Sequence, residues 1–447
     1  MKKINRRQFL QTAGLGTLAS MGGIQMGFGS QLFGTRGLTN GRDILVYVFL
    51  YGGMDGLNLL PPRTGTHAAN YQDLRPSIQV PNSQILPLTN SDFGFHPQAD
   101  GLQALFNSGK MAIVHACGML QANRSHFDSI TYLELGTPGN KNTPTGWLTR
   151  YFESSLATPA DSPIPLMVPN WNSPNSVLGS QKAVVVGSPE EFKLTAGHWA
   201  WTETSQTAME GMYNPAGDVA DRAGSLALSA SATLQAVFDP NNPYVPENGA
   251  VYPTDSYFGD RLRSLAQIIK ADIGMEVAYV PLGGWDTHAA QDSFADPANP
   301  GEFGGLVREL SQGLMAFYTD LSVSHAGRIT IVVQSEFGRR AYENADGGTD
   351  HGYGNPLLVI GDNVNPGFFG SFPGLGAGEL YEDQDVAVTT DYRQVISEIL
   401  IRRTKNRFLG HVFPGFSNYT PLGVVQGQDM PPVYDFNFDN IYAAGFE

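Results

Sequence analysis

The feature of the sequence that most constrains the fold is the segment at positions 43–51, which is apolar after Asp43 and continues directly into a glycine-rich turn. Hydrophobic side chains occupy consecutive positions of this run, so both of its faces are apolar, as in a central strand of a parallel sheet. Similar runs cover residues 110–117, 276–282, 329–333 and 356–361, and segments with helical periodicity stand between them. This alternation predicts an α/β fold with a doubly wound, mostly parallel sheet.

Polar residues follow the predicted strands. The carboxyl ends of parallel strands meet at one edge of a sheet, where open α/β sheets bind ligands. This edge should therefore gather carboxylates, imidazoles and a hydroxyl, which come from Asp55, Ser125, Asp286, His288, Glu336 and His351. Such a set suits two clustered divalent cations, with Zn²⁺ or Mn²⁺ favoured and Ca²⁺ or Mg²⁺ as alternatives. The competing interpretation is structural, with Asp55 capping its turn and Ser125 capping a helix.

Composition and charge exclude several classes of partner. The chain has 447 residues, 41% of them hydrophobic, which suffices for one large α/β domain with insertions or for two domains. Its formal net charge of −15 argues against nucleic acid and against an anionic membrane surface as partners. The single cysteine, Cys117, rules out an intramolecular disulfide, and its apolar surroundings indicate a core residue rather than a nucleophile.

The first 29 residues are typical of an export signal. A basic start that contains Arg6 and Arg7 precedes a weakly apolar stretch, and no acidic residue occurs before Asp43. The paired arginines favour a twin-arginine signal, and hence a periplasmic or secreted protein that meets the twin-arginine translocase during export. The alternatives are an ordinary secretory signal or a short membrane anchor. No later run approaches the roughly 18 apolar residues that a membrane span needs, so no stable span is expected.

The rest of the chain divides into three predicted parts. Residues 30–425 form the α/β domain, in which residues 156–249 are predicted to be an irregular insertion or cap region because they are rich in Ser, Asn, Pro and Gly. Residues 426–447 form an acidic tail rich in proline and aromatic residues, for which the sequence indicates no role.

Seven short motifs occur in one order along the chain, and together they resemble a family of bacterial proteins of unknown function that are exported by the twin-arginine route. That family is placed in the alkaline phosphatase and sulfatase superfamily. The motifs lie at residues 49–58, 125–128, 146–151, 283–288, 335–339, 348–352 and 389–393. The resemblance covers most of the chain after residue 29 and implies the superfamily's α/β core and a hydrolase site with two metal ions.

The resemblance also implies roles for single residues. Asp55 matches the metal-binding aspartate after the first strand, and Ser125 lies where the superfamily places its nucleophile. Asp286 and His288 resemble the ligands of one metal ion, and His351 resembles the late histidine ligand.

Three features depart from the superfamily's pattern. Glu336 stands where an Asp-His pair usually serves the second metal ion, and the spacing of Asp286 and His288 is shorter than usual. Residues 125–128 lack the short Pro/Ala-containing motif in which sulfatases convert Cys or Ser to formylglycine. Phosphate esters are therefore favoured over sulfate esters as substrates.

The leading hypothesis is an exported metal-dependent hydrolase of small anionic esters, which uses Ser125 or a metal-bound water as its nucleophile. Surrounding residues that orient the ligands or bind substrate oxygens are predicted to be Arg124, His126, Arg339 and Asp350. Two alternatives remain. One is a non-catalytic exported binding or envelope-assembly protein with the hydrolase fold, and the other is a metal-independent carbohydrate-binding protein.

Overall fold

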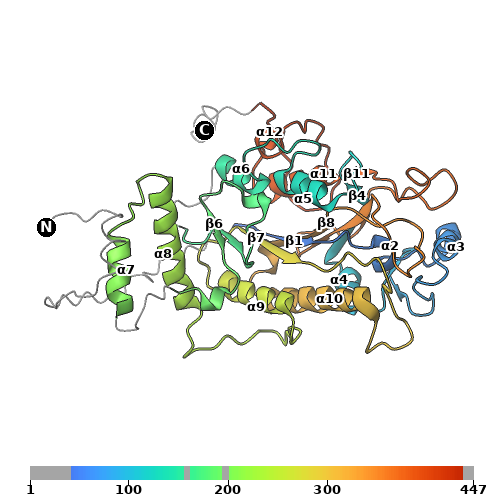
Figure 1. Ribbon diagram of the computed structural model, residues 1–447, viewed down its shortest axis with the longest axis horizontal. Helices are drawn as coiled ribbons and strands as arrows, with labels where there is room; N and C mark the ends of the chain where they lie inside the picture. The colour runs from blue at the N-terminus through green and yellow to red at the C-terminus, as the bar shows by residue number, and fades with distance from the viewer. Residues whose placement is uncertain (1–41, 156–161, 194–200, 436–447) are drawn as a thin grey trace.

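A computed structural model describes residues 42–155, 162–193 and 201–435, and its centre is a nine-stranded sheet (Figure 1). The predicted signal at residues 1–29 lies outside the described residues. The strands follow one another in space as β10-β4-β9-β8-β1-β7-β5-β6, and β11 also pairs with β4. Their bounds are β1 Ile44–Leu50, β4 Met111–Gly118, β5 Leu166–Val168, β6 Ala183–Val185, β7 Val277–Leu282, β8 Ile329–Ser335, β9 Asn355–Ile360, β10 Gly367–Phe369 and β11 Thr390–Asp391. A separate hairpin joins β2 (Leu86–Pro87) to β3 (Gly94–Phe95).

The sheet is mostly parallel, as predicted. Strand β1 is central and pairs in parallel with β7 and with β8, and β5 continues the parallel arrangement beyond β7. Strand β9 is the exception, because it is antiparallel to both β8 and β4. Two antiparallel pairings in succession restore the direction, so β4 runs the same way as β8. The carboxyl ends of β1, β4, β7 and β8 therefore lie at one edge of the sheet.

Alternate side chains of β1 belong to two different cores. Ile44, Val46 and Val48 lie in one buried cluster with α4, α9 and α10, whereas Leu45 and Tyr47 lie in a second with α6 and α11. Helices thus cover both faces of the sheet, which confirms the doubly wound α/β prediction. The helices are α2 Gly56–Leu59, α3 Gly65–Leu74, α4 Asp100–Asn107, α5 His126–Leu135, α6 Trp147–Ser154, α7 Thr202–Glu210, α8 Val219–Val237, α9 Tyr257–Lys270, α10 Gly301–Leu321, α11 Tyr392–Arg402 and α12 Leu409–Val412.

The segment predicted to be an insertion or cap, residues 156–249, contributes in part to the sheet itself. Strands β5 and β6 extend the sheet beyond β7, in a register that aligns Leu166 with Val277. Helices α7 and α8 instead project away from the sheet (Figure 1), and no residue of α7 is buried. The sequence of residues 183–187 is strand-like, in agreement with β6, whereas the three residues of β5 are too few for a visible pattern.

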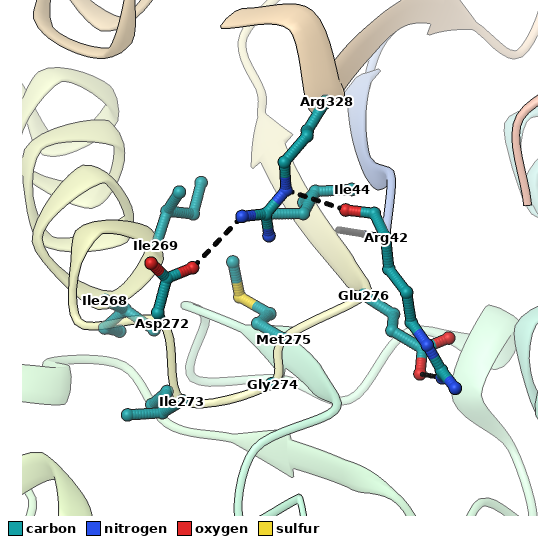
Figure 2. A pocket seen from close by; sticks show the side chains of 10 residues that line it. All are labelled: Arg42, Ile44, Ile268, Ile269, Asp272, Ile273, Gly274, Met275, Glu276 and Arg328. Carbon is teal, nitrogen blue, oxygen red and sulfur yellow. Dashed lines mark hydrogen bonds and ion pairs between the residues drawn. The ribbon is translucent and has the colours of Figure 1, made fainter. Parts of the chain in front are cut away.

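The amino ends of β1, β7 and β8 are closed by paired charges. Figure 2 shows Arg328 between Asp272 and the carbonyl of Arg42, and Arg42 beside Glu276. The Arg42–Glu276 pair is 2.7 Å apart and the Arg328–Asp272 pair 3.2 Å apart. The hollow that these residues line encloses about 10 Å³, which is barely enough for one water molecule.

Two further observations concern the periphery. Among the described helices, none is long and apolar enough to cross a membrane. The first part of the acidic tail packs on the domain, because the backbone N–H groups of Val433 and Gly410 make hydrogen bonds to Arg407 and Val433 carbonyls.

Candidate metal centre

Three histidines and one aspartate converge at the carboxyl edge of the sheet. Oδ1 of Asp286 lies 2.9 Å from Nε2 of His288, 3.0 Å from Nε2 of His351 and 3.3 Å from Nε2 of His126. Nε2 of His351 lies 2.9 Å from that of His126 and 3.0 Å from that of His288. The ligand atoms of His126, Asp286 and His351 all lie within 4.8 Å of one another, and Nε2 of His288 adjoins those of Asp286 and His351. We call these four residues the three-histidine cluster.

The opposite ring nitrogen of each histidine faces a group that can only accept a hydrogen bond. Nδ1 of His126 lies 2.8 Å from Oε1 of Glu336, and Nδ1 of His351 lies 2.8 Å from the carbonyl oxygen of Arg124. Nδ1 of His288 lies 3.3 Å from Oδ1 of Asp350. Each Nδ1 must therefore carry the proton, which leaves a lone pair on each Nε2 when the ring is neutral.

This arrangement points to a cation. Three neutral Nε2 lone pairs and a carboxylate oxygen repel one another when nothing positive lies between them. A tetrahedral ion with bonds of about 2.0–2.1 Å would separate its ligands by about 3.3 Å, close to the spacing observed here. Carboxylate or carbonyl partners on the outer ring nitrogen are also what metal-ligating histidines have in proteins. The donor set therefore fits a divalent metal ion, and His126, Asp286 and His351 by themselves already meet the spacing that a metal site needs.

Four loops bring these residues together. His126 is the first residue of α5, which follows β4; Asp286 and His288 follow β7; and His351 lies in the long loop after β8. The loop after β1 contributes backbone instead of ligands. Gly52 has a φ of +122°, and a Cβ there would lie 2.5 Å from the backbone nitrogen of Asp286. Glycine at position 52 is thus needed for the close approach of the β1 and β7 loops.

Arg339 binds the loops together beneath the cluster. Its buried guanidinium donates to the carbonyl oxygens of Gly52, Gly53, Trp285 and Thr349. It also lies 2.6 Å from Oδ1 of Asp286. The sequence predicted that Arg339 would orient ligands or bind substrate oxygens. Its position beneath Asp286 is that of an orienting group, because its donors face these five oxygens and Nε2 of His288.

Asp55 stands apart from the three-histidine cluster. It is fully buried, and its Oδ2 lies 2.6 Å from Nη1 of Arg75 and 2.6 Å from Nε2 of Gln291. Its Oδ1 accepts a hydrogen bond from the backbone of Leu57, so that it caps α2. The structural interpretation of Asp55 accounts for both carboxylate oxygens. Arg75, which supplies the counter-charge, carries no signal in the sequence that would link it to Asp55.

Glu336 is close to the cluster but behind it. Its Oε1 accepts hydrogen bonds from His126 and from the backbone of Gly52, and its Oε2 accepts one from Ser335. The sequence predicted Glu336 as a ligand and His126 as a supporting residue. In the structure His126 has the position of a ligand and Glu336 that of its support, since the imidazole of His126 lies between Glu336 and Asp286. The signal that favours His126 is its position at the start of α5, where a side chain points back over the sheet edge.

Ser125 and Arg124 precede α5 and lie beside the cluster. Oγ of Ser125 accepts a hydrogen bond of 3.4 Å from the backbone of Asp128 and so caps the helix. The backbone oxygen of Arg124 holds His351, while its side chain pairs with Asp385 and Glu382. At 3.4 Å this capping hydrogen bond is long and holds the Ser125 hydroxyl only weakly. The role of Ser125 as a nucleophile stays a prediction.

Local electrostatics favour an ionised Asp286. Burial alone would raise the pKa of Asp286, but the hydrogen bond and charge of Arg339, with His351 and His126, hold that pKa well below its usual range. The hydrogen bond that His126 donates to Glu336 raises the pKa of His126, and burial lowers the pKa of His351. Asp286 and His288 remain open to solvent, with 48% and 43% of their side chains exposed. The centre is therefore accessible from outside.

The sequence from residue 42 to residue 407 matches the model of a protein family described as "Protein of unknown function (DUF1501)". The chain belongs to this family. The match spans every loop that contributes to the three-histidine cluster. No curated protein matches the sequence.

Several solved structures resemble the DUF1501 chain at low identity. A protein in the alkaline phosphatase superfamily from Vibrio parahaemolyticus is 9% identical with a TM-score of 0.33, and the match covers 73% of this chain and 62% of that one. Ps i-CgsB in complex with k-i-k-neocarrahexaose is 11% identical with a TM-score of 0.33, covering 73% and 67%. The phosphonate monoester hydrolase of Agrobacterium radiobacter is 10% identical with a TM-score of 0.28, covering 71% and 68%.

Proposed function

We propose that this DUF1501 protein is an exported hydrolase of phosphate or sulfate esters that holds one divalent cation in the three-histidine cluster. The observation that carries the proposal is the direction of the three imidazoles. Their Nδ1 atoms face acceptors, so their Nε2 lone pairs meet Asp286 around one point. A divalent cation at that point would stabilise all of these lone pairs at once.

One ion is supported in place of the two that the sequence predicts. The carboxylates available for a second ion are already neutralised or bonded, since Asp55 pairs with buried Arg75 and Glu336 bonds to His126. Arg339 supplies the second positive charge beside Asp286. A guanidinium surrounded by carbonyl oxygens and a carboxylate occupies the kind of place that a hard cation would otherwise take.

Zn²⁺ suits the three imidazoles and one carboxylate best, with Mn²⁺ as the second choice. An ion held there would polarise an ester oxygen and lower the pKa of a bound water toward neutrality. Glu336 fixes the ring of His126 and makes it a stronger donor. The exposed sides of Asp286 and His288 leave the centre open to a substrate, whereas structural zinc sites are closed.

The first test is metal content, measured by plasma mass spectrometry on tag-free protein purified without chelators. We expect one equivalent of a divalent metal in the wild type and none in Asp286→Ala/His351→Ala. His325→Ala is the matched control, because His325 lies 3.5 Å from Asp272 at the other end of the sheet. It should keep the metal. Metal-free wild-type protein that fails to take up Zn²⁺ or Mn²⁺ on titration would refute the site.

The second test is turnover of p-nitrophenyl phosphate, bis-p-nitrophenyl phosphate and p-nitrophenyl sulfate by the metal-loaded protein. Turnover that disappears in Ser125→Ala while metal content stays constant assigns the nucleophile to Ser125. Turnover that survives assigns it to water. A full metal complement without turnover of any of these esters would favour the exported binding or envelope-assembly protein.

Export by the twin-arginine route is part of the same proposal and rests on the basic, paired-arginine start of the chain. Cell fractionation of the wild type and of Arg6→Lys/Arg7→Lys tests it. The wild type should appear in the periplasm or medium, and the variant should stay inside the cell. Equal export of both would point to an ordinary secretory signal.

A further inference from the structure

Exposed aromatic side chains flank the three-histidine cluster on both sides. Phe127, directly after His126, is 86% exposed, and Trp171, shortly after β5, is 74% exposed. Strands β4 and β5 run parallel to β7, so both side chains lie at the same edge of the sheet as the cluster. Exposed rings of this size at a ligand-binding edge are candidates for contact with a substrate.

The ring of Trp171 is held flat with one face free. A Cβ built on Gly187 would lie 2.2 Å from the two central carbon atoms of the indole, so the ring covers the Gly187 backbone face-on. Its loop is anchored at both ends. Nη2 of Arg261 lies 3.3 Å from Oδ1 of Asn170, and the backbone of Asn175 donates to buried Glu134. The exposed indole is thus a supported platform instead of a loose surface side chain.

The sheet order places the loop of Trp171 beside a loop of the cluster. Asp286 and His288 follow β7, and Trp171 follows β5, the strand that pairs with β7. A ligand that contacts the metal centre and Trp171 together therefore crosses from one loop to the next.

The surroundings of Trp171 select its chemistry. The neighbours Asn172 and Ser173 are uncharged hydrogen-bonding side chains, which suit hydroxyl groups, whereas Asn170 is held by Arg261. A flat aromatic face beside such groups matches a sugar ring, which presents C–H groups on one face and hydroxyls at its edge. The net charge of −15 argues against a nucleic acid or another densely anionic chain. A lipid would need a continuous apolar surface instead.

We propose that the carboxyl edge binds a glycan chain, with a sparsely distributed ester at the three-histidine cluster and a neighbouring sugar unit stacked on Trp171. This inference rests on the proposed hydrolase function, since it names the substrate class for that centre. Stacking on Trp171 itself does not require the metal. The two proposals can therefore fail separately.

The experiment titrates the metal-loaded, full-length exported protein with cellohexaose, maltohexaose and N-acetylchitohexaose. Binding is followed by tryptophan fluorescence and calorimetry. At least one hexasaccharide should bind more tightly than its disaccharide, and Trp171→Ala should weaken that binding about tenfold or more. Trp201→Ala is the matched control, because Trp201 is also exposed, at 52%, but precedes α7 far from the cluster in the fold. It should bind as the wild type does.

Gly187→Ala gives a second, independent variant. It keeps the tryptophan but places a methyl group where the indole now rests, so it should weaken binding as Trp171→Ala does. Both variants should keep the metal content of the wild type, and chelator-treated protein should still bind the hexasaccharide. No binding of any hexasaccharide, or binding that is equal in Trp171→Ala and Trp201→Ala, would overturn the proposal. Glycan binding by a protein that takes up no metal would instead refute the hydrolase site and leave the platform standing.

Discussion

The two ends of the central sheet carry similar side chains and use them differently. At the amino ends of β1, β7 and β8, each carboxylate has a guanidinium of its own, as in Arg42–Glu276 and Arg328–Asp272. At the carboxyl ends of the same strands, Arg339 is the guanidinium of the cluster, and three imidazole lone pairs remain around Asp286. In the first arrangement every charge has its partner, whereas the second keeps imidazole lone pairs that suit a metal ion.

This difference shows how a functional site can be told from a structural ion pair. Paired opposite charges lower one another's energy and need nothing else. Acceptors that face one another are stabilised by a proton or by a cation between them. The number of ionisable residues at an edge is therefore less informative than the direction of their lone pairs.

The largest expected effect compares two arginines at opposite ends of the sheet. Arg339→Met removes a buried guanidinium that satisfies five oxygens, and it should lower the free energy of unfolding by about 3–5 kcal/mol. Arg328→Met removes a partly exposed partner of Asp272 and should cost about 0–1 kcal/mol. Urea unfolding measures both values. Equal losses would show that Arg339 is no more essential than an ordinary ion-pair residue.

A smaller effect concerns the coupling of metal binding to stability. Zn²⁺ at about 100 times its dissociation constant should stabilise the wild type by about 2.7 kcal/mol, because the unfolded chain lacks the site. His351→Ala should show no such gain, and His325→Ala, at the amino end, should show all of it. Calorimetric melting with and without Zn²⁺ tests the difference. A gain in both variants would mean that the ion binds elsewhere.

The residues behind the histidines should have graded effects on metal affinity. Glu336→Gln weakens the short contact to His126 and should reduce affinity about 10–100-fold. Asp350→Asn alters the longer, more exposed contact to His288 and should reduce affinity by less, about tenfold, at the low end of that range. Competition titration with a zinc chelator measures both. The reverse order would show that His288, not His126, is the ligand whose orientation matters more.

The smallest effect separates a ligand histidine from a core histidine. His115 also lies on β4, but three phenylalanine rings surround it at centroid distances of 4.7–5.5 Å, and burial lowers its pKa to about 4. The folded value lies below the unfolded value of about 6.5, so stability is full above pH 6.5 and is lost as the pH falls toward 4.

His115→Phe should remove this loss, which amounts to about 1 kcal/mol at pH 5.5. Urea unfolding of both proteins at pH 7.5 and pH 5.5 gives the comparison. The free energy of unfolding of the wild type, relative to that of His115→Phe, should be lower at pH 5.5 than at pH 7.5. An unchanged difference would mean that His115 does not titrate as a buried neutral group.

Much of the fold could be predicted from the sequence, because the local spacing of apolar residues indicates which faces of a strand or helix are buried. Strands β1, β4, β7 and β8 occur where apolar runs indicate them, and α9 and α10 occur where the helical pattern does. The direction of β9 and the existence of β5 were not visible. No helix lies in residues 336–354, between β8 and β9. The chain therefore returns beside β8 as the antiparallel strand β9, instead of crossing over to form a parallel one.

The sequence by itself determined that Asp286, His288 and His351 follow strand ends and share one edge of the sheet. Only the tertiary structure decided which charged groups are free to bind an ion. Asp55 meets Arg75 across α3, and Asp286 meets Arg339 from another loop. Such pairings depend on atoms that folding brings within 3 Å of one another, and no local pattern records them. The positions of the main strands along the chain follow from short-range apolar patterns, whereas the chemistry of the edge follows from long-range contact.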